Sequence, residues 1–446
     1  MRDERPTSVR AAEAPAGYAY PEQLVRLVSD CWAEASGDIS RLPDAATLHE
    51  FFSACYQASM MRDEERPVAF RAILADPGDF PREEMPPEGL QRLEFTDARP
   101  FDPGELQRLS VVADPQRTLI AVCSDAEGRL RIWGLINSGT RWMRHVHGGR
   151  RAGTPLPPAP VVRVDAPGSL SAYRGEELVG TLQGGRLAGS RVDVFASQWL
   201  PAQFTPFLDE LIEWHETARR SALERTGETW AALEPDLPRR ITERLHKRVI
   251  SALREERHGG TVLFIPWEDA VDVSDAKAYI DLNYRFAEGR SRSCFPHLIV
   301  DLLNRLAQLY GDSDAHHVKP VGWREFEETT DDAITTLDEA LFELAHLLGG
   351  LAAVDGALVL NKHHDLLGFG GMVAGRLPEV RTVWRALDLE GEELAEEEIG
   401  SVGARHRAAY RIAAALPGSI AIVISQDGGV RFVSKKGDRV VYWEQD

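Results

Sequence analysis

The chain has 446 residues, 43% of them hydrophobic and 27% charged, so it can bury cores and is too long for one ordinary domain. Its net charge of −19 disfavours long polyanionic partners such as nucleic-acid tracts. The longest uncharged apolar run, residues 344–354, is too short for a membrane helix, and the N-terminus lacks the apolar core of a signal peptide. We therefore expect a cytoplasmic protein without membrane association.

The first half of the chain changes from helical to β-type patterning. Residues 20–61 place apolar side chains at three- and four-residue steps on either side of the Pro43-Asp44 break, which predicts two helices. From Val68 onward, short apolar runs separated by turn-forming stretches predict strands. The runs are VAFRAIL, SVVAD, TLIAVCS, LRIWGLI, VVRVD and VDVFA. We predict an N-terminal helical segment over residues 1–65 and a β-rich domain over residues 66–200.

The second half is predicted to form a helical bridge and then an α/β domain. Residues 201–257 carry helical periodicity, and TVLFIP (261–266) is typical of a buried strand. Helices are expected at 294–310, from the cap residue Asp331 to Gly349-Gly350, and at 404–416. Strands are expected in VDGALVL (354–360) and in the hairpin IAIVIS–QDGG–VRFVSK. Residues 258–446 are thus predicted to form a mixed β-sheet flanked by helices.

Two pairs of segments suggest an internal repeat. EGRLRIWGLINSG (127–139) parallels HDLLGFGGMVAG (364–375), and APGSLSAYRGEELVGTLQGGRL (166–187) parallels LPGSIAIVISQDGGVRFVSKKGDRV (416–440). Chance matching of turns that are rich in small residues explains the similarity equally well. If the repeat is real, the β-rich domain is a degenerate copy of the C-terminal domain.

Several familiar chemistries have no motif in this sequence. It contains no GxxxxGK[ST] phosphate loop and no HExxH metal helix, and its four cysteines lie far apart. His316-His317 and His363-His364 lack a third metal ligand at a sensible spacing, so solvated turn histidines are the simpler interpretation. Trp133, Trp142 and Trp443 are expected to be packing residues.

Two segments contain the parts of a nucleotide phosphate site. Asp355-Gly356-Ala357 stands at the mouth of a predicted strand, and Gly403-Ala404-Arg405-His406-Arg407 at the start of a predicted helix. A helix N-terminus favours anions, and arginines add bidentate donors for phosphate oxygens. A carboxylate can hold a divalent cation or orient a ribose hydroxyl. An arginine-rich helix start that pairs with the upstream acidic segment GEELAEEEIG accounts for these residues equally well.

With these motifs, residues 258–442 resemble the diadenylate cyclase domain of the DisA N-terminal type. That family carries a DGA motif, a GTRHRAA motif, and a strand that ends in Ser-Glu-Glu before a hairpin. Here VDGALVL, GARHRAAYRIAA and IVISQDGGVRFVSKKG occur in the same order. The rest of the chain is similar to divergent, sensor-type (DACNV-like) relatives of the family, which are proposed for signalling and conflict systems.

The resemblance implies condensation of two ATP molecules to cyclic di-AMP with Mg²⁺ or Mn²⁺. It implies that Asp355 is the catalytic residue and a metal ligand, and that Asp427 is a second metal ligand. The nucleotide would be bound by Gly356, Ala357, Gly403, Arg405, His406, Arg407 and Ser425.

Three residues depart from the family pattern, namely Val354, Ala404, which lacks the phosphate-binding hydroxyl of the family threonine, and Gln426. None of them removes Asp355 or the Arg-His-Arg triplet, so nucleotide binding is better supported than turnover. The alternative function is therefore an inactive sensor for ATP, another adenine nucleotide or a cyclic dinucleotide. Family cyclases work as two domains face to face, so we expect a homodimer or an intramolecular pseudo-dimer. In a pseudo-dimer the first half would offer a basic segment without a DGA motif, namely Arg144, His145, His147, Arg150 and Arg151.

Overall fold

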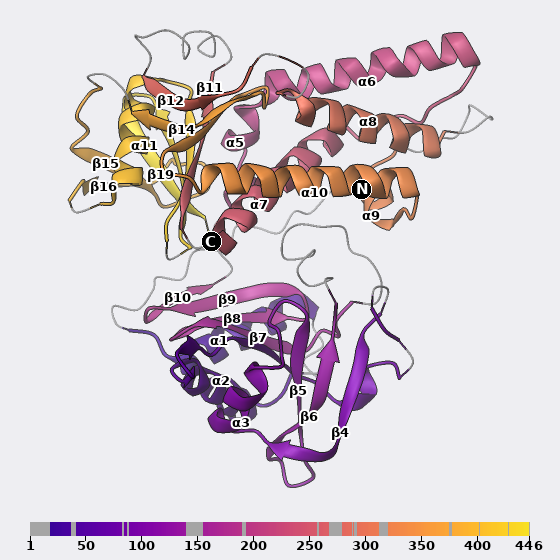
Figure 1. Cartoon of the computed structure of the whole chain (residues 1–446), viewed down its shortest axis with the longest axis vertical. Helices are drawn as coiled ribbons and strands as arrows, with labels where there is room; N and C mark the ends of the chain where they lie inside the picture. Colours follow the sequence, from indigo (N-terminus) through magenta and orange to yellow (C-terminus); the bar gives the residue numbers. More distant parts are fainter. Residues whose placement is uncertain are drawn as a thin grey trace. The chain divides into compact units, whose positions relative to one another are not determined.

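The chain folds into two compact units, each with its own mixed β-sheet (Figure 1). Unit 1 comprises residues 1–146 and 151–191, and unit 2 comprises residues 147–150 and 192–446. The computed structural model describes residues 18–36, 42–82, 84–86, 89–139, 155–189, 193–256, 258–266, 279–287, 289, 292–311, 320–373, 377–400, 402–426 and 428–445. Both units combine helices with parallel and antiparallel strands, so the predicted α/β class is confirmed.

Unit 1 is an eight-stranded sheet with helices on one face. Its helices are α1 (Pro21–Ser36), α2 (Ala45–Ser59) and α3 (Pro103–Ser110). In spatial order the strands are β10 (Arg186–Gly189), β9 (Glu177–Gln183), β8 (Ser169–Arg174), β7 (Pro160–Ala166), β3 (Phe70–Leu74), β5 (Thr118–Ser124), β6 (Leu130–Asn137) and β4 (Gln91–Pro100). A separate small hairpin joins β1 (Arg62–Asp63) to β2 (Arg66–Pro67). The Asp44 side chain accepts bonds from two backbone N–H groups at the start of α2, which explains why the helical pattern breaks there.

Unit 2 is a nine-stranded sheet covered by helices on both faces. Its helices are α5 (Trp199–Ala202), α6 (Thr205–Thr226), α7 (Leu237–Glu256), α8 (Cys294–Leu309), α9 (Trp323–Glu328), α10 (Asp332–Ala352) and α11 (Ala404–Ala415). In spatial order the strands are β12 (Ile280–Arg285), β14 (Leu366–Val373), β13 (Ala357–Asn361), β11 (Gly260–Ile265), β17 (Ile420–Ile424), β18 (Val430–Lys436), β19 (Arg439–Gln445), β15 (Thr382–Ala386) and β16 (Leu394–Glu398). The long helices α6 and α7, predicted as a bridge, lie within this unit.

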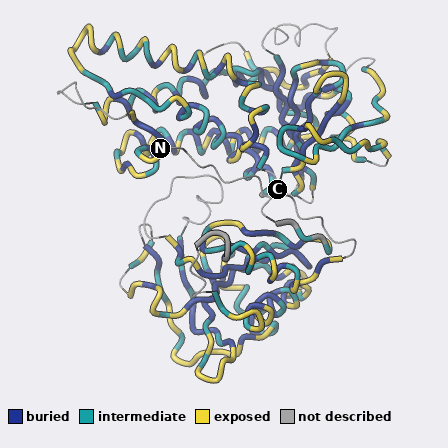
Figure 2. Tube along the Cα trace, turned by 180° about the vertical axis from the view of Figure 1, so that it is seen from behind, coloured by how far each residue is buried: buried dark blue, intermediate teal, exposed yellow. Residues whose placement is uncertain are grey.

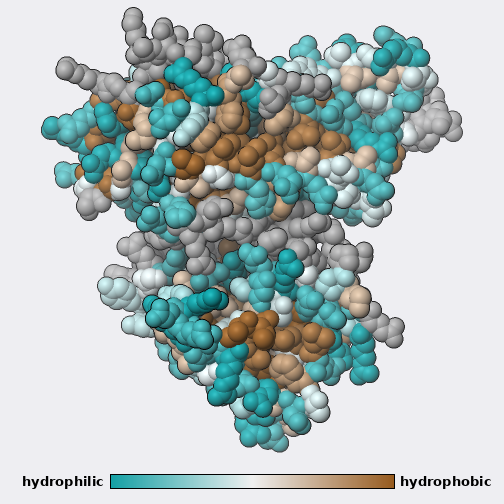
Figure 3. Space-filling model, in the orientation of Figure 1, coloured by the Kyte–Doolittle hydropathy of each residue, from teal (hydrophilic) through white to brown (hydrophobic). Residues whose placement is uncertain are grey.

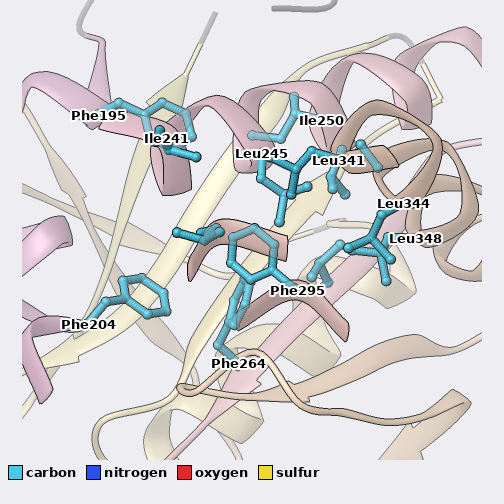
Figure 4. Close-up of a cluster of buried hydrophobic side chains, with 14 of the residues drawn as sticks. Phe195, Phe204, Ile241, Leu245, Ile250, Phe264, Phe295, Leu341, Leu344 and Leu348 are labelled. Carbon is cyan, nitrogen blue, oxygen red and sulfur yellow. The ribbon is translucent and has the colours of Figure 1, made fainter. Parts of the chain in front are cut away.

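One face of the unit 2 sheet carries the larger apolar core. Side chains of α7, α8 and α10 meet Phe264 of β11 there, as Figure 4 shows for residues such as Leu245, Phe295 and Leu344. The opposite face packs against α11 through a second cluster that includes Ile412. Because β11 and β17 contribute side chains to both clusters, every residue of these strands is buried (Figure 2).

The two sheets share one topology. In each, a central strand pairs in parallel with one neighbour (β3 with β5, β11 with β13) and antiparallel with the other (β7, β17). The order β4-β6-β5-β3-β7-β8-β9 of unit 1 corresponds to β12-β14-β13-β11-β17-β18-β19 of unit 2, in both space and chain order. Seven strands therefore repeat.

The repeat seen in the sequence is half right. Its first pair of segments contains β6 and β14, which are topologically equivalent. Its second pair is shifted by one strand, because Pro167-Gly168-Ser169 joins β7 to β8 whereas Pro417-Gly418-Ser419 precedes β17. The equivalent of Gly168 is Gly428 in the β17–β18 turn, and both have a positive φ (+68° and +87°). Shared turn chemistry, rather than equivalent position, made the wrong segments look alike.

Three local predictions are wrong. SVVAD (110–114) is the end of α3 and a turn rather than a strand, and VDVFA contains a 3₁₀ turn over Val194–Ala196. Apolar runs this short do not distinguish a strand from other buried or half-buried segments. Gly349-Gly350 does not end α10, which continues to Ala352.

Among the described residues, no helix combines the length and the apolar character needed to cross a membrane.

Figure 3 shows a band of apolar side chains on unit 2 surrounded by polar ones. Single exposed apolar residues such as Leu347 of α10, 55% exposed, are ordinary on protein surfaces.

Candidate functional site

The loop between α10 and β13 presents Asp355 to solvent. The Asp355 side chain is fully exposed, and the following Gly356 has a φ of +108°, a conformation that favours glycine. A Cβ on Gly356 would lie 2.6 Å from the carbonyl carbon of Gly370. The loop therefore lies directly against the backbone of β14, and this contact holds Asp355 at the start of β13.

The N-terminus of α11 carries the basic motif. Gly403 is the cap residue, with extended φ and ψ, and as a glycine it has no side chain with which to cap the first turn. The backbone N–H groups of this turn can thus bond to an anion. Arg405 is half-buried, whereas Arg407 is exposed and donates from Nη2 to the Val402 carbonyl at 3.2 Å. The His406 ring lies 6.5 Å from the Tyr410 ring, between their centroids.

The fold brings these two segments together. Arg405 Nη2 lies 3.9 Å from Asp355 Oδ1, although fifty positions separate them in sequence. β13 runs parallel to β11 and β17 runs antiparallel, so the start of β13 and the end of β17 lie at one end of the sheet. α11 precedes β17 and packs on it, so its N-terminus reaches the same end. An exposed ion pair of this length contributes little to stability.

Ser425 follows the last residue of β17 and begins the turn to β18. The Ser425 hydroxyl donates to the Gly429 carbonyl at 3.1 Å, and the Ser425 N–H bonds to the same oxygen at 2.9 Å. The Ser425 hydroxyl therefore supports the turn. Asp427, the expected second metal ligand, lies outside the described residues.

A divalent cation has few protein ligands at this site in the described part of the chain. No group of three or more His, Cys, Asp or Glu residues gathers there in a way that could hold a metal. Asp355 is the carboxylate that could bind Mg²⁺ or Mn²⁺. Because Mg²⁺ is commonly held by one or two carboxylates together with substrate phosphates, Asp355 fits a cation that arrives with a nucleotide.

Sequence reasoning missed Arg431 and Tyr410 beside the site. Arg431 of β18 lies opposite Val423 of β17, and it donates to Tyr410 Oη at 3.3 Å and to Glu444 Oε1 at 2.8 Å. Burial raises the pKa of Tyr410. The signal in the sequence was an arginine between the apolar residues of VRFVSK, an arrangement that buries an arginine stem.

The predicted solvation of His363-His364 is wrong for His364. It is 3% exposed, and its Nε2 lies 2.8 Å from Nε2 of His246 on α7. Burial lowers the pKa of His246 to about 4 and that of His364 well below its usual value, so both rings are neutral and one donates to the other. The adjoining cavity of about 10 Å³ is apolar and holds at most about one water. A nucleotide cannot enter it.

Of the other residues singled out in the sequence, some are buried in the core and the rest lie outside the described structure. Trp133 and Trp443 are buried, as expected for packing residues. Trp142, His316-His317 and the basic segment over residues 144–151 lie outside the described structure.

Comparison with known protein families gives a match in the first half of the chain. Residues 37–137 match the family DACNV, described as "Probable sensor domain DACNV". The matched stretch lies in unit 1 and runs through α2, the central strand β3, and β6. No curated protein and no solved structure matches the chain. The sensor-type resemblance is thus supported for the first unit, while the resemblance of unit 2 to diadenylate cyclases stays a prediction.

Proposed function

We propose that this protein is a nucleotide sensor that binds an adenine nucleotide or cyclic dinucleotide at the end of the unit 2 sheet. The observation that carries the proposal is the meeting of Asp355 and Arg405 at the N-terminus of α11, where the cap residue is a glycine. The match of residues 37–137 to a probable sensor domain adds support.

Each group of the site has a distinct task in this proposal. The guanidinium groups of Arg405 and Arg407 and the N–H groups of the first turn of α11 donate to phosphate oxygens. Asp355 accepts a hydrogen bond from a ribose hydroxyl. Gly403 leaves the start of α11 open, since a Cβ there would meet only His406 Nδ1 at 4.0 Å, whereas Gly356 lets the loop that carries Asp355 pack against β14.

Diadenylate cyclase activity is the second candidate, because the fully exposed Asp355 carboxylate can accept a cation or a proton. In that reaction a ribose 3′-oxygen bonds to the α-phosphorus of a second ATP, the bond to pyrophosphate breaks, and the hydroxyl proton leaves to a base. Two such steps give cyclic di-AMP and two pyrophosphates. A bound Mg²⁺ or Mn²⁺ would neutralise phosphate charge.

The test is a calorimetric titration of the full chain with ATP and with cyclic di-AMP, with and without Mg²⁺ or Mn²⁺. The double variant Arg405→Gln, Arg407→Gln should bind at least about tenfold more weakly, since hydrogen bonds to charged groups contribute about 1.5–3 kcal/mol each. The matched control is Arg381→Gln, whose side chain is 84% exposed and pairs with Glu379 just before β15.

Product analysis separates the two candidates. Cyclic di-AMP and pyrophosphate formed by the parent chain and absent from Asp355→Asn would favour the cyclase. Binding without turnover under both metals would favour the sensor. Equal affinity of the double variant and the Arg381→Gln control, or no binding by the parent chain, would overturn the proposal.

A further inference from the structure

The shared topology allows the two sheets to be aligned residue by residue. In unit 1, Ala72 of the central strand pairs with Ile120 on one side and Val162 on the other. In unit 2, Val262 pairs in the same way with Leu358 and Ile422, so we align Ala72 with Val262. This alignment also superimposes the register shift at Ala121/Val122 of β5 on the shift at Val359/Leu360 of β13. An irregularity at the same place supports the alignment independently of the strand order.

The end of the unit 1 sheet that corresponds to the candidate site is rich in arginine. Counting along the aligned strands, Arg117 occupies the position of Asp355, just before the parallel strand. Arg71 takes the place of Thr261, and Arg163 takes the place of Val423. Where unit 2 has one acidic and two uncharged residues, unit 1 therefore has three basic ones.

Hydrogen bonds connect two of these arginines. The fully buried Arg71 donates from Nη2 to Ser138 Oγ at 3.1 Å, and Ser138 Oγ donates to the Arg117 carbonyl at 3.0 Å. The Arg71 guanidinium is thereby held under the loop that carries Arg117. The Arg117 side chain itself is 58% exposed, with Nε 3.8 Å from Asp114 Oδ2.

The third arginine adds charge from the neighbouring strand. Arg163 lies directly opposite Arg71 across β3 and β7, and its Nε donates to Asp165 Oδ1 at 2.8 Å. Burial and the nearby charge of Arg163 lower the pKa of Arg71, but a guanidinium remains protonated at neutral pH. Two like charges directly opposite each other, as Arg71 and Arg163 are, destabilise a sheet. Salt screens their repulsion little, because Arg71 is buried. A bound anion would offset this cost.

We propose that this end of the unit 1 sheet binds a small phosphate-bearing anion without a metal, through the guanidinium groups of Arg117, which is 58% exposed, and Arg163, which is 23% exposed. Arg71 is a positioning residue that adds positive charge from beneath. Arg71 and Arg117 lie within the stretch that matches the probable sensor domain. The acids near the site, Asp114, Asp165 and Glu176, are partly exposed, and the anion would compete with them for the arginines. This site is separate from the proposed site in unit 2 and does not depend on it.

The test is a titration of the full chain with inorganic pyrophosphate in EDTA, performed in the Arg405→Gln, Arg407→Gln background to remove binding by unit 2. We expect Arg117→Gln to weaken the remaining binding by about tenfold or more. The matched control is Arg129→Gln in the turn at the other end of β5. Its side chain is 69% exposed and also pairs with an aspartate, Asp125. Affinity should also fall as salt rises.

The outcomes separate this proposal from the function proposed for unit 2. Binding that survives in the background, weakens with Arg117→Gln and is unchanged with Arg129→Gln supports the unit 1 site. No binding in the background, or equal affinities of the Arg117 and Arg129 variants, overturns it. The unit 2 proposal is decided separately by the titrations with ATP and cyclic di-AMP, so it can fail while the unit 1 site stands.

Discussion

Replacing Gly356 by alanine tests whether the loop before β13 lies as closely against β14 as the structure shows. The new Cβ would sit 2.6 Å from the Gly370 carbonyl carbon and 2.8 Å from its Cα, both backbone atoms that no side-chain rotation can move. The φ of +108° adds backbone strain of about 1–3 kcal/mol. Overpacking adds about 1–3 kcal/mol more. We expect the β13–β14 region to lose about 2–6 kcal/mol of opening free energy.

Hydrogen exchange measured by mass spectrometry is the assay, because it reports the opening of β13 and β14 separately from unfolding of the other unit. The control is Gly350→Ala in the last turns of α10, where a Cβ meets no atom within 4 Å. That substitution should be neutral or stabilise the helix by up to about 1 kcal/mol. Unchanged protection of β13 in Gly356→Ala would refute the close contact.

Two further predictions concern pH and helix capping. The pKa of His246 is about 4 in the folded chain and about 6.5 when unfolded, so the unfolded state binds more protons below pH 6.5. Stability should fall by about 3 kcal/mol between pH 6.5 and 4, and His364 should add to the loss. Urea denaturation at pH 7.5 and 5 should show a smaller loss for His246→Gln, and an identical loss would contradict this origin. Asp331 caps α10 and pairs with Arg305, so Asp331→Ala should cost about 1–2 kcal/mol in thermal unfolding and Asp331→Asn less. Equal losses would show that the cap bond is not the source.

Much of the secondary structure followed from local patterns in the sequence. The hydrophobic periodicity and caps predicted α2, α8, α10 and α11, because each helix depends on bonds and side chains within about four residues. The hairpin β17–β18 followed from its turn residues. Local patterns failed for SVVAD, where a four- or five-residue run carries too little information. They also missed β12, β15 and β16, strands at or near the edges of the unit 2 sheet.

The sequence by itself determined the long helices and central strands of unit 2 and the two segments of the candidate site, because periodicity and motif spacing depend on residues that are close together in the chain. Only the tertiary structure decided which of these residues meet. The approach of Arg405 to Asp355, the burial of His364 against His246, and the alignment of Arg117 with Asp355 all depend on strand order. Strand order is set by packing between residues that are far apart in the chain, and no local pattern in one sequence encodes it.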